Sequence, residues 1–454
     1  MSKSTVRFAS DSMGKIAITK GKLWGAQTER AYQHFAINTE IMPWEIICAL
    51  ATIKKAAALA NSKLKILPKY KAKLIVRASD EIIRGKLTAN FCLNIWQSGS
   101  GTQTNMNVNE VIANRATQLG GRTNSGKNLL HPNDDVNMSQ STNDIFPTAM
   151  HVATLILAQQ KLLPALHNLQ QELRRKERKF KHLTKVGRTH LQDAIPLTLG
   201  QEFSGYRVQI DETLANIKLA LKKLLNVPLG GTAVGNGANT PKKFGQIATR
   251  YLAQFTKINF REAKNKFALL AAHDDLVNFS GTLKTLAVAL IKIANDVRWM
   301  NSGPRCGLGE LILPSNEPGS SMMPGKVNPT QCEMLTMIGA QVLGNDATIT
   351  FAGSQGNFEL NVFKPVIIYN LLQSLHLLSD GCNSFVRYAL RGLTANTAQI
   401  KKHLKNSLMT ATQLAPTLGY DQTAKIVQLA AKENISWQKA RAKLQKACAR
   451  KNHR

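Results

Sequence analysis

Apolar residues recur at helical spacing through the middle of the chain, from about residue 144 to residue 389. They return mainly every three or four positions, which places them on one face of an α-helix. The clearest runs are Leu155, Leu162, Leu166, Leu169 and Leu173; Leu214, Ile217, Leu221 and Leu224; and Leu283, Leu286, Leu290, Ile293 and Val297. Segments of roughly 30 residues make rods of about 45 Å. Because rods with an apolar stripe pack together, the pattern predicts a long-helix bundle, and apolar residues beyond one stripe indicate partner chains.

Strand patterns are sparse in the rest of the chain. The pattern turns helical from Pro43 to Gly85 and again from Asn109 to Leu119, whereas residues 1–45 are rich in turn residues. Beyond residue 390 we expect a shorter, basic helical segment with a break at Pro416–Gly419. The prediction is an all-α protein with a little irregular β structure at the N-terminus. Its expected domains are residues 1–138, 139–390 and 391–454.

A loop at residues 319–329 combines two adjacent hydroxyls, a cation and an amide. Its two glycines and two prolines exclude a regular element. Pro329 suits the first position of the helix that follows, and Asn328 is able to cap that helix. Lys326 and Asn328 then lie beside a helix N-terminus, which favours a bound anion such as a carboxylate. An ordinary surface loop has a similar composition, so other segments must decide.

The segment at residues 97–107 is dense in hydroxyl and amide side chains and precedes a predicted helix. Its small residues permit close approach of the backbone to a ligand, and Ser100 and Thr102 can donate hydrogen bonds to carboxylate oxygens. Glycine- and serine-rich loops are commonly linkers, so this segment is weak evidence by itself.

A second segment, residues 139–144, holds more capping residues than one helix needs. A single N-cap requires one such side chain. The surplus makes this segment a candidate binding rim as well as a cap. The residues of the rim are Ser141, Thr142 and Asn143.

The chain is strongly basic, with 59 lysines and arginines against 28 acidic residues and a net charge of +31. Such a balance first suggests nucleic acid or an anionic surface as a partner. The basic residues lie mostly on predicted amphipathic helices, where a solvated outer face is the more common role. These runs are Lys54–Lys55, Arg174–Lys176, Lys222–Lys223 and Lys401–Lys402. A positive field would also attract a small dianion.

Composition and cysteine spacing narrow the class further. Apolar residues make up 43% of the chain and charged residues 19%, which is ordinary for a soluble globular protein. No apolar run approaches the roughly 18 residues of a membrane span, and the N-terminus lacks the apolar core of a secretory signal. The six cysteines have neither metal-ligand nor disulfide-framework spacing. We expect a cytoplasmic protein with free thiols, no metal site, no cofactor and no membrane partner.

His190 is the histidine that stands in a polar loop, residues 187–194, next to Thr189. A histidine alone is more often structural. With a carboxylate to hold its tautomer, it becomes a candidate general acid or base. Glu333, in the first turn after the lysine-containing loop, is the candidate orienting carboxylate.

The hydroxyls of Ser320 and Ser321 offer a second proton-transfer group. Neither serine lies in a GxSxG motif, which disfavours acyl transfer. Two proton-transfer groups among carboxylate binders suit an elimination beside a carboxylate. Lys326 and Asn328 would then hold the dianionic, enolate-like species that forms.

These residues lie in motifs that resemble the fumarase/aspartase superfamily. The pattern Gly319-Ser320-Ser321-x-Met323-Pro324-x-Lys326-x-Asn328 resembles the superfamily signature, and the resemblance covers nearly the whole chain. Within the superfamily, residues 97–103, 187–193 and 324–328 resemble the iron-independent, or class II, fumarate hydratases. Aspartases carry glutamine where His190 stands and alanine where Gly325 stands.

The resemblance implies an all-α fold of the fumarase/aspartase type, a long-helix bundle with small N- and C-terminal domains. It implies a hydro-lyase of the tricarboxylic acid cycle that interconverts fumarate and (S)-malate by general acid/base catalysis through an aci-carboxylate intermediate. Ser320 would take the C3 proton of malate, and His190, supported by Glu333, would handle the water. The implied substrate-binding residues are Ser100, Thr102, Ser141, Thr142, Asn143, Thr189, Ser321, Lys326 and Asn328.

The resemblance also implies features beyond the active site. A second, non-catalytic dicarboxylate site would involve His131, Asn133 and Asp134, although Asn128 stands where an arginine of that site is expected. The protein would be a homotetramer, with each active site assembled from three chains and without a cofactor.

Two alternatives differ in class from a fumarate hydratase. An aspartate ammonia-lyase-like enzyme is the nearest, and His190 argues against it. The other is a basic, helical protein that binds nucleic acid or an anionic surface on the same scaffold. The intact set of Ser320, His190, Lys326 and Glu333 argues against a loss of enzymatic function and makes nucleic acid a disfavoured partner.

Overall fold

The computed structural model describes residues 6–122 and 129–451. Helices contain 64% of the residues and the strands are short, which confirms the predicted all-α class. The chain groups into two compact units. Unit 1 comprises Met1–Pro164, Thr213–Ala287 and Ile338–Ser379, and unit 2 comprises Ala165–Glu212, Val288–Met337 and Asp380–Arg454. The division into three contiguous domains stays a prediction.

Unit 1 opens with an antiparallel hairpin, which is the β structure expected near the N-terminus. The hairpin consists of β1 (Val6–Asp11) and β2 (Gly14–Thr19). The α-helices that follow in this unit are α1 (Ala26–His34), α2 (Trp44–Lys63), α3 (Lys69–Ile83), α4 (Thr102–Leu119), α5 (Thr142–Leu157), α8 (Phe244–Thr256) and α9 (Lys266–Ala271). Two-residue strands complete the unit: β5 (Asn226–Val227), β6 (Arg261–Glu262), β8 (Gly356–Asn357) and β9 (Leu360–Asn361).

Unit 2 contains a second hairpin and the C-terminal helices. The hairpin pairs β3 (Thr184–Thr189) with β4 (Gln192–Thr198), and β7 (Leu311–Ile312) pairs with β10 (Thr394–Ala395). The helices are α6 (Leu163–Lys179), which starts at the end of unit 1, α13 (Thr397–Asn406), α14 (Ala415–Leu418), α15 (Tyr420–Glu433) and α16 (Trp437–Lys451). The predicted break at Pro416–Gly419 is confirmed only at Gly419, which separates α14 from α15; Pro416 to Leu418 lie inside α14, where a proline in the first turn is tolerated.

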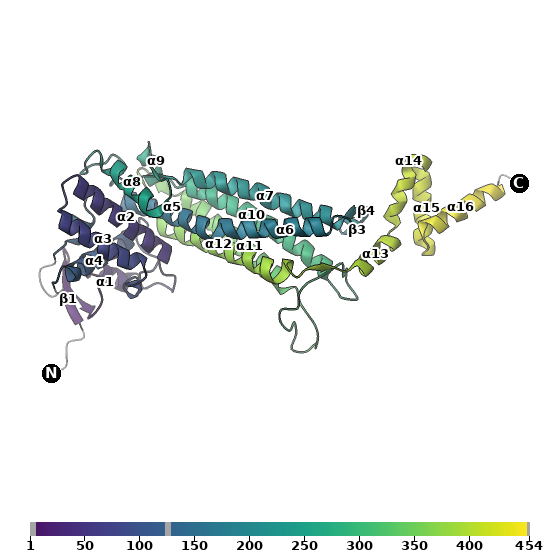
Figure 1. The fold of residues 1–454 in the computed structure, drawn as a ribbon, viewed down its shortest axis with the longest axis horizontal. Coiled ribbons are helices and arrows are strands. Elements are labelled where there is room, and N and C mark those ends of the chain that lie inside the picture. The colour runs from purple at the N-terminus through teal and green to yellow at the C-terminus, as the bar shows by residue number, and fades with distance from the viewer. Residues whose placement is uncertain (1–5, 123–128, 452–454) are drawn as a thin grey trace. The chain divides into compact units, whose positions relative to one another are not determined.

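Four long helices contribute residues to both units: α7 (Leu199–Lys223), α10 (Asp274–Asn301), α11 (Thr330–Gly353) and α12 (Lys364–Phe385). Figure 1 shows them lying side by side with α6. Polar pairs cross between neighbours, as between Tyr206 on α7 and Asp296 on α10 and between Ser280 on α10 and Asp346 on α11. The predicted long-helix bundle is therefore present.

The apolar stripes read from the sequence form the core of these helices. Every residue of the three predicted runs is buried. The five residues of the third run, from Leu283 to Val297 on α10, are each at most 1% exposed. Fully burying one such side chain stabilises a fold by roughly 1.5–3 kcal/mol.

Helix α10 is, by length and composition, long and apolar enough to cross a membrane. Half of its most apolar window is buried inside the protein. The core helix of a soluble protein passes the same test, so this helix is weak evidence for a membrane span.

Helix α4 begins at Thr102, seven positions before the predicted start at Asn109. Gly101 precedes it with φ +82°, a left-handed conformation that glycine adopts readily. The first turns were missed because their buried positions are polar: Asn105 and Asn107 are each 1% exposed. A buried asparagine does not register in a search for apolar periodicity.

Candidate active site

His190 lies at the tip of a β-hairpin, where the sequence suggested only a polar loop. Thr189 pairs with Gln192, so the turn contains two residues, His190 and Leu191. Their φ angles are +55° and +59°, the left-handed values of a type I′ turn. Two-residue turns of this type are usually recognised in a sequence by Asn-Gly or Asp-Gly. Neither pair occurs here, so the hairpin was not predicted.

The tip of this hairpin is open to solvent. Thr189, His190 and Leu191 are all exposed. Within the described part of the chain, no hydrogen bond engages the His190 imidazole, and Glu333 of the same chain is not its partner. The ring is therefore available to a substrate or to another chain.

The loop at residues 319–328 is closed on itself by two hydrogen bonds. Gly319 N donates to Lys326 O at 2.8 Å, and Asn328 Nδ2 donates to Gly319 O at 2.7 Å. A Cβ atom on Gly319 would lie 2.5 Å from Lys326 O. Glycine is needed at position 319 because the backbone segments at the two ends of the loop approach each other so closely. Ser320 and Lys326 are thus held in one compact loop.

Ser320 is the half-buried member of the serine pair in this loop. Its Oγ accepts hydrogen bonds from Met322 N at 3.2 Å and from Met323 N at 3.1 Å. Two backbone donors aimed at one oxygen stabilise negative charge on it. The arrangement suits an oxygen that accepts a proton.

Helix α11 begins at Thr330, one residue later than the predicted start at Pro329. Cys332 N and Glu333 N both donate to Pro329 O. The Asn328 side-chain amide instead donates the hydrogen bond to Gly319 O that closes the loop. Within the described residues no backbone N–H of α11 donates to the side-chain oxygen of Asn328, so the predicted capping role is not observed. Glu333 lies half-buried in the first turn of the helix, as expected.

Lys326 is an exposed cation two residues before Asn328. Among the residues that the structure describes, no acceptor binds its ammonium group. An unpaired lysine in a loop that leads into a 24-residue helix suits an anionic ligand.

Ser100 and Thr102 form a short series of hydroxyls at the start of α4. Ser98 Oγ lies 3.0 Å from Ser100 Oγ, which lies 2.9 Å from Thr102 Oγ1. Ser100 is buried and Thr102 is half-buried. Together they place hydroxyl donors at the N-terminus of an 18-residue helix, which again favours an anion.

The rim residues Ser141 to Asn143 cap helix α5 and also bond to other segments of unit 1. Asn143 N donates to Ser141 Oγ, and Ser141 N donates to Asp144 Oδ1 at 2.9 Å, which forms a capping box at the start of α5. Asn143 Nδ2 donates to Ala233 O at 2.8 Å. Thr142 Oγ1 accepts from Asn105 Nδ2 at 3.0 Å.

Asp144 ties this rim to a second loop and was missed as a functional candidate. Its Oδ2 accepts from Gly230 N at 2.9 Å and from Thr232 N at 3.1 Å. Burial raises the pKa of Asp144 to about 6, against the opposing effect of its N–H donors and of Lys54. An acidic residue three positions after a serine cap was the signal available in the sequence.

Lys54 was assigned to a solvated helix face, and this prediction is wrong. Its exposed fraction is 0%, and its Nζ donates to Asn137 Oδ1 at 2.7 Å and to Gln140 Oε1 at 3.1 Å. Asn105 bridges Asn137 Oδ1 to Thr142, so the buried lysine is linked to the rim. Burial lowers the pKa of Lys54 to about 7, although the charge of Asp144 opposes that shift. Lys176, placed in another such run, is equally buried.

The predicted site residues divide between the two units. Unit 1 holds Ser100, Thr102, Ser141, Thr142 and Asn143. Unit 2 holds Thr189, His190, Ser320, Ser321, Lys326, Asn328 and Glu333. The hydroxyl series is brought together within unit 1, and the serine, lysine and asparagine of the closed loop within unit 2.

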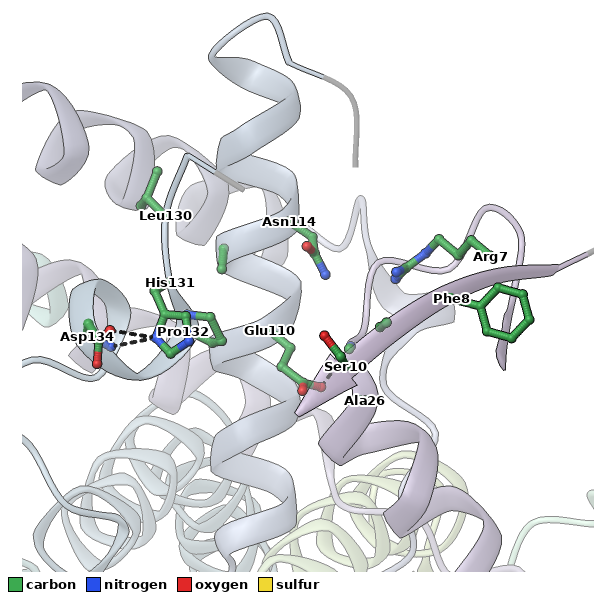
Figure 2. A pocket seen from close by; sticks show the side chains of 13 residues that line it. Arg7, Phe8, Ser10, Ala26, Glu110, Asn114, Leu130, His131, Pro132 and Asp134 are labelled. Carbon is green, nitrogen blue, oxygen red and sulfur yellow. Dashed lines mark hydrogen bonds and ion pairs between the residues drawn. The ribbon is translucent and has the colours of Figure 1, made fainter. Parts of the chain in front are cut away.

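The predicted second dicarboxylate site borders a cavity in unit 1 with a volume of about 550 Å³. His131 Nδ1 accepts from Asp134 N at 3.2 Å and lies 3.1 Å from Asp134 Oδ2. Figure 2 shows these two residues on one side of the cavity and Arg7 on the other. Asn133, which lies between His131 and Asp134 in the sequence, is exposed to solvent. Asn128 lies outside the described residues.

Two charged groups in this cavity are engaged by the protein itself. Glu110 accepts hydrogen bonds from Gly25 N, Gln27 N and Thr28, while burial raises its pKa. The Arg7 guanidinium donates to Lys22 O at 3.1 Å and to Trp24 O. The cavity is therefore lined by an acidic and a basic side chain, Glu110 and Arg7, and both are hydrogen-bonded to the protein.

Groups of three or more histidine, cysteine, aspartate or glutamate side chains able to hold a metal ion are absent from the described residues. The hydroxyl, amide, ammonium and imidazole groups above suit a small anion and the transfer of protons.

The sequence and the fold match known lyases. A family model described as Lyase matches residues 14–344. The chain is 56% identical to a protein named "Fumarate hydratase class II" from Thermosynechococcus vestitus, over 96% of this chain and 94% of that protein. It is 52% identical to a protein of the same name from Bacillus subtilis, over 97% and 95%. The crystal structure of a class II fumarase from Schistosoma mansoni superposes with a TM-score of 0.95 at 43% identity, covering 97% and 95%.

Proposed function

We infer that the chain, which belongs to the lyase family and within it to the class II fumarate hydratases, catalyses the reversible hydration of fumarate to (S)-malate. The observation that carries this function is identity above 50% over nearly the full length of several proteins of that name. The chain is therefore a hydro-lyase. A role in the tricarboxylic acid cycle and a cytoplasmic location are the accompanying proposals.

Ser320 removes the C3 proton of malate in the proposed mechanism. The electron pair of the C3–H bond moves into the adjacent C4 carboxylate and gives an aci-carboxylate with two negative charges. The two backbone donors to Ser320 Oγ support this role, because they stabilise the anionic form that accepts a proton.

His190 completes the elimination. It donates a proton to the C2 hydroxyl, the C–O bond breaks, and water leaves as the electron pair of the aci-carboxylate forms the double bond of fumarate. Glu333 holds the imidazole in the required tautomer. In hydration the same groups act in reverse.

The dianionic intermediate requires several donors. Lys326 and Asn328 hold one carboxylate beside α11, and the hydroxyls and amides of unit 1 hold the other, together with Thr189 and Ser321. The unpaired state of the Lys326 ammonium supports this assignment. Loss of one such donor costs about 10²- to 10³-fold in rate.

We propose a homotetramer in which each active site is assembled from three chains. Large apolar side chains on the long helices support partner chains, because they are exposed in a single chain: Leu219, Val288, Met337 and Phe351. The absence of an imidazole–Glu333 contact within the described chain also suits a site shared between chains. The cavity at His131, Asn133 and Asp134 is the proposed second dicarboxylate site.

Fumarate formation from malate, followed by ultraviolet absorbance, tests the function and the roles together. Ser320→Ala and His190→Asn should each lower kcat by at least about 10²-fold, as expected for loss of a proton-transfer group. Wild-type turnover in either variant would overturn the role given to that residue. Aspartate in place of malate tests the ammonia-lyase alternative, and fumarate appearing from it at a comparable rate would contradict the proposed substrate.

A further inference from the structure

A cluster of four charged side chains lies along β3, the first strand of the hairpin that carries His190. Glu310 has an exposed fraction of 0% and accepts from Arg188 Nη1 at 3.0 Å and from Arg188 Nη2 at 2.8 Å. Lys185 Nζ lies 3.3 Å from Glu310 Oε2 and donates to Glu202 Oε2 at 2.8 Å. Two cations face two carboxylates, so the charges are balanced, and the two buried ones, Lys185 and Glu310, each have a partner.

The paired arginine is two residues from the catalytic turn. Arg188 lies opposite Asp193 in the register of the hairpin, and Thr189 and Gln192 close the two-residue turn. Its planar guanidinium makes two parallel hydrogen bonds to one carboxylate, which fix direction as well as distance. The end of β3 is thereby held just before the chain reverses.

The backbone of Glu310 is itself held from two sides. Glu310 N donates to Met300 O at 2.7 Å, at the end of α10, and Asn396 N donates to Glu310 O at 2.9 Å. The carboxylate is therefore attached to the helix bundle and to the segment that starts α13. A rigid carboxylate can orient the arginine that it binds.

The backbone conformation of the turn is unfavourable and needs restraint from its surroundings. His190 and Leu191 both adopt left-handed φ values without being glycine, which costs of order 1 kcal/mol for each residue. Such conformations persist only where the surroundings hold them. The hairpin tip is exposed, so the restraint must come from β3 just before the turn, where Arg188 binds the buried Glu310.

We propose that Glu310 is a positioning residue for the hydration reaction: through Arg188 it fixes the end of β3 and with it the direction of the His190 imidazole. The inference rests on the proposed function, in which His190 moves the proton of the departing or attacking water. Glu310 touches neither substrate nor reacting atoms.

The variant Glu310→Gln tests this role. It should lower kcat by about 10- to 100-fold, the effect of misplacing a catalytic group by about 1 Å. The KM for malate should rise less than kcat falls, because Thr189 is the one proposed carboxylate donor on β3, whereas Lys326 and the other proposed donors lie on other segments. The matched control is Glu177→Gln, which removes a partner of Arg207 in the same unit, and its kcat should equal that of the wild type.

A second measurement separates positioning from loss of folded enzyme. In deuterium oxide, the ratio of C3 proton exchange in malate to net fumarate formation does not depend on how much enzyme is active. If Glu310 acts on His190, slower C–O cleavage returns the intermediate to malate more often, and the ratio rises in Glu310→Gln as it does in His190→Asn. It should not rise in Glu177→Gln.

Arg188→Lys keeps the charge and loses the bidentate geometry, so it tests the same point if Glu310→Gln folds poorly. It should also raise the exchange ratio. An unchanged ratio in both variants, or an unchanged kcat in Glu310→Gln, would overturn the inference. If His190→Asn retains full turnover, the proposed role of His190 fails instead, and the two failures are thereby distinguished.

Discussion

At the scale of single residues, buried charge gathers behind the candidate binding rim. Lys54 and Asp144 both have exposed fractions of 0%. The lysine reaches Thr142 through Asn137 and Asn105, and the aspartate holds the backbone on both sides of the rim. Burying such groups costs free energy that hydrogen bonds only partly offset. The two buried charges therefore fix the geometry of the rim at a cost in the free energy of folding.

Lys54 makes the free energy of unfolding depend on pH. Its pKa in the folded state, about 7, is below the ordinary lysine value of 10.5, which applies to the unfolded chain. Between these values the unfolded state binds more protons, so stability should rise as pH increases from 7 to 10. Below pH 7 both states are protonated, and the cost of burying the charge is constant. The expected gain is of order several kcal/mol.

Urea unfolding at fixed protein concentration, from pH 7 to pH 10, measures this dependence. Lys54→Met should give a flatter curve than the wild type, because the group that binds the proton is gone. Lys63→Met, on the exposed side of the same helix, should keep the wild-type slope. Parallel curves for wild type and Lys54→Met would show that Lys54 does not titrate in this range.

At the scale of elements, α4 depends on a glycine at its start. Gly101 has φ +82°, and a Cβ atom there would lie 2.3 Å from the Phe146 ring. Gly121, just after the same helix, has φ +80° and open space around it. The two positions share a backbone conformation and differ in packing.

Alanine at each position should separate these two effects. Gly121→Ala should destabilise by about 1 kcal/mol, the cost of a left-handed alanine. Gly101→Ala should cost a further 1–3 kcal/mol or so through overpacking against Phe146. It should also weaken malate binding, because Ser100 and Thr102 flank the site. Equal urea midpoints for the two variants would mean that the ring moves aside freely.

At the scale of the whole molecule, the proposed site is shared between chains. Ser320→Ala and His190→Asn homotetramers should both be nearly inactive. Mixed tetramers refolded from equal amounts should regain activity at about one quarter of the sites, if serine and histidine of one site come from different chains. The control mixes Ser320→Ala with Lys326→Ala. Those residues share one closed loop of one chain, so no activity should return.

Recovery is measured by the malate assay on tetramers isolated by size. Activity in the control mixture, or none in the first mixture, would contradict the assignment of the two residues to different chains. A sample that stays monomeric would contradict the proposed assembly itself.

Several features could be predicted because they are local. The stripes from Leu155 to Val297 were identified from spacing, and all are buried. The loop at residues 319–328 was recognised from its glycines, prolines and polar groups, and the break before Tyr420 from Gly419. Each depends on residues within a few turns of one another, which fix backbone preference directly.

Other features depended on segments distant in sequence. Lys54 is indistinguishable from its neighbour Lys55 until Asn137 and Gln140 are placed beside it. The early start of α4 is stabilised by buried asparagines, and the His190 hairpin by Glu310, which follows 120 residues later.

The sequence by itself determined the helical class, the apolar stripes, the chemistry of the loops and the family. The tertiary structure decided which polar and charged side chains are buried and which partners hold them. The physical reason is that periodicity and turn chemistry act over a few residues, whereas burying a charge becomes tolerable only when groups from distant segments pair with it.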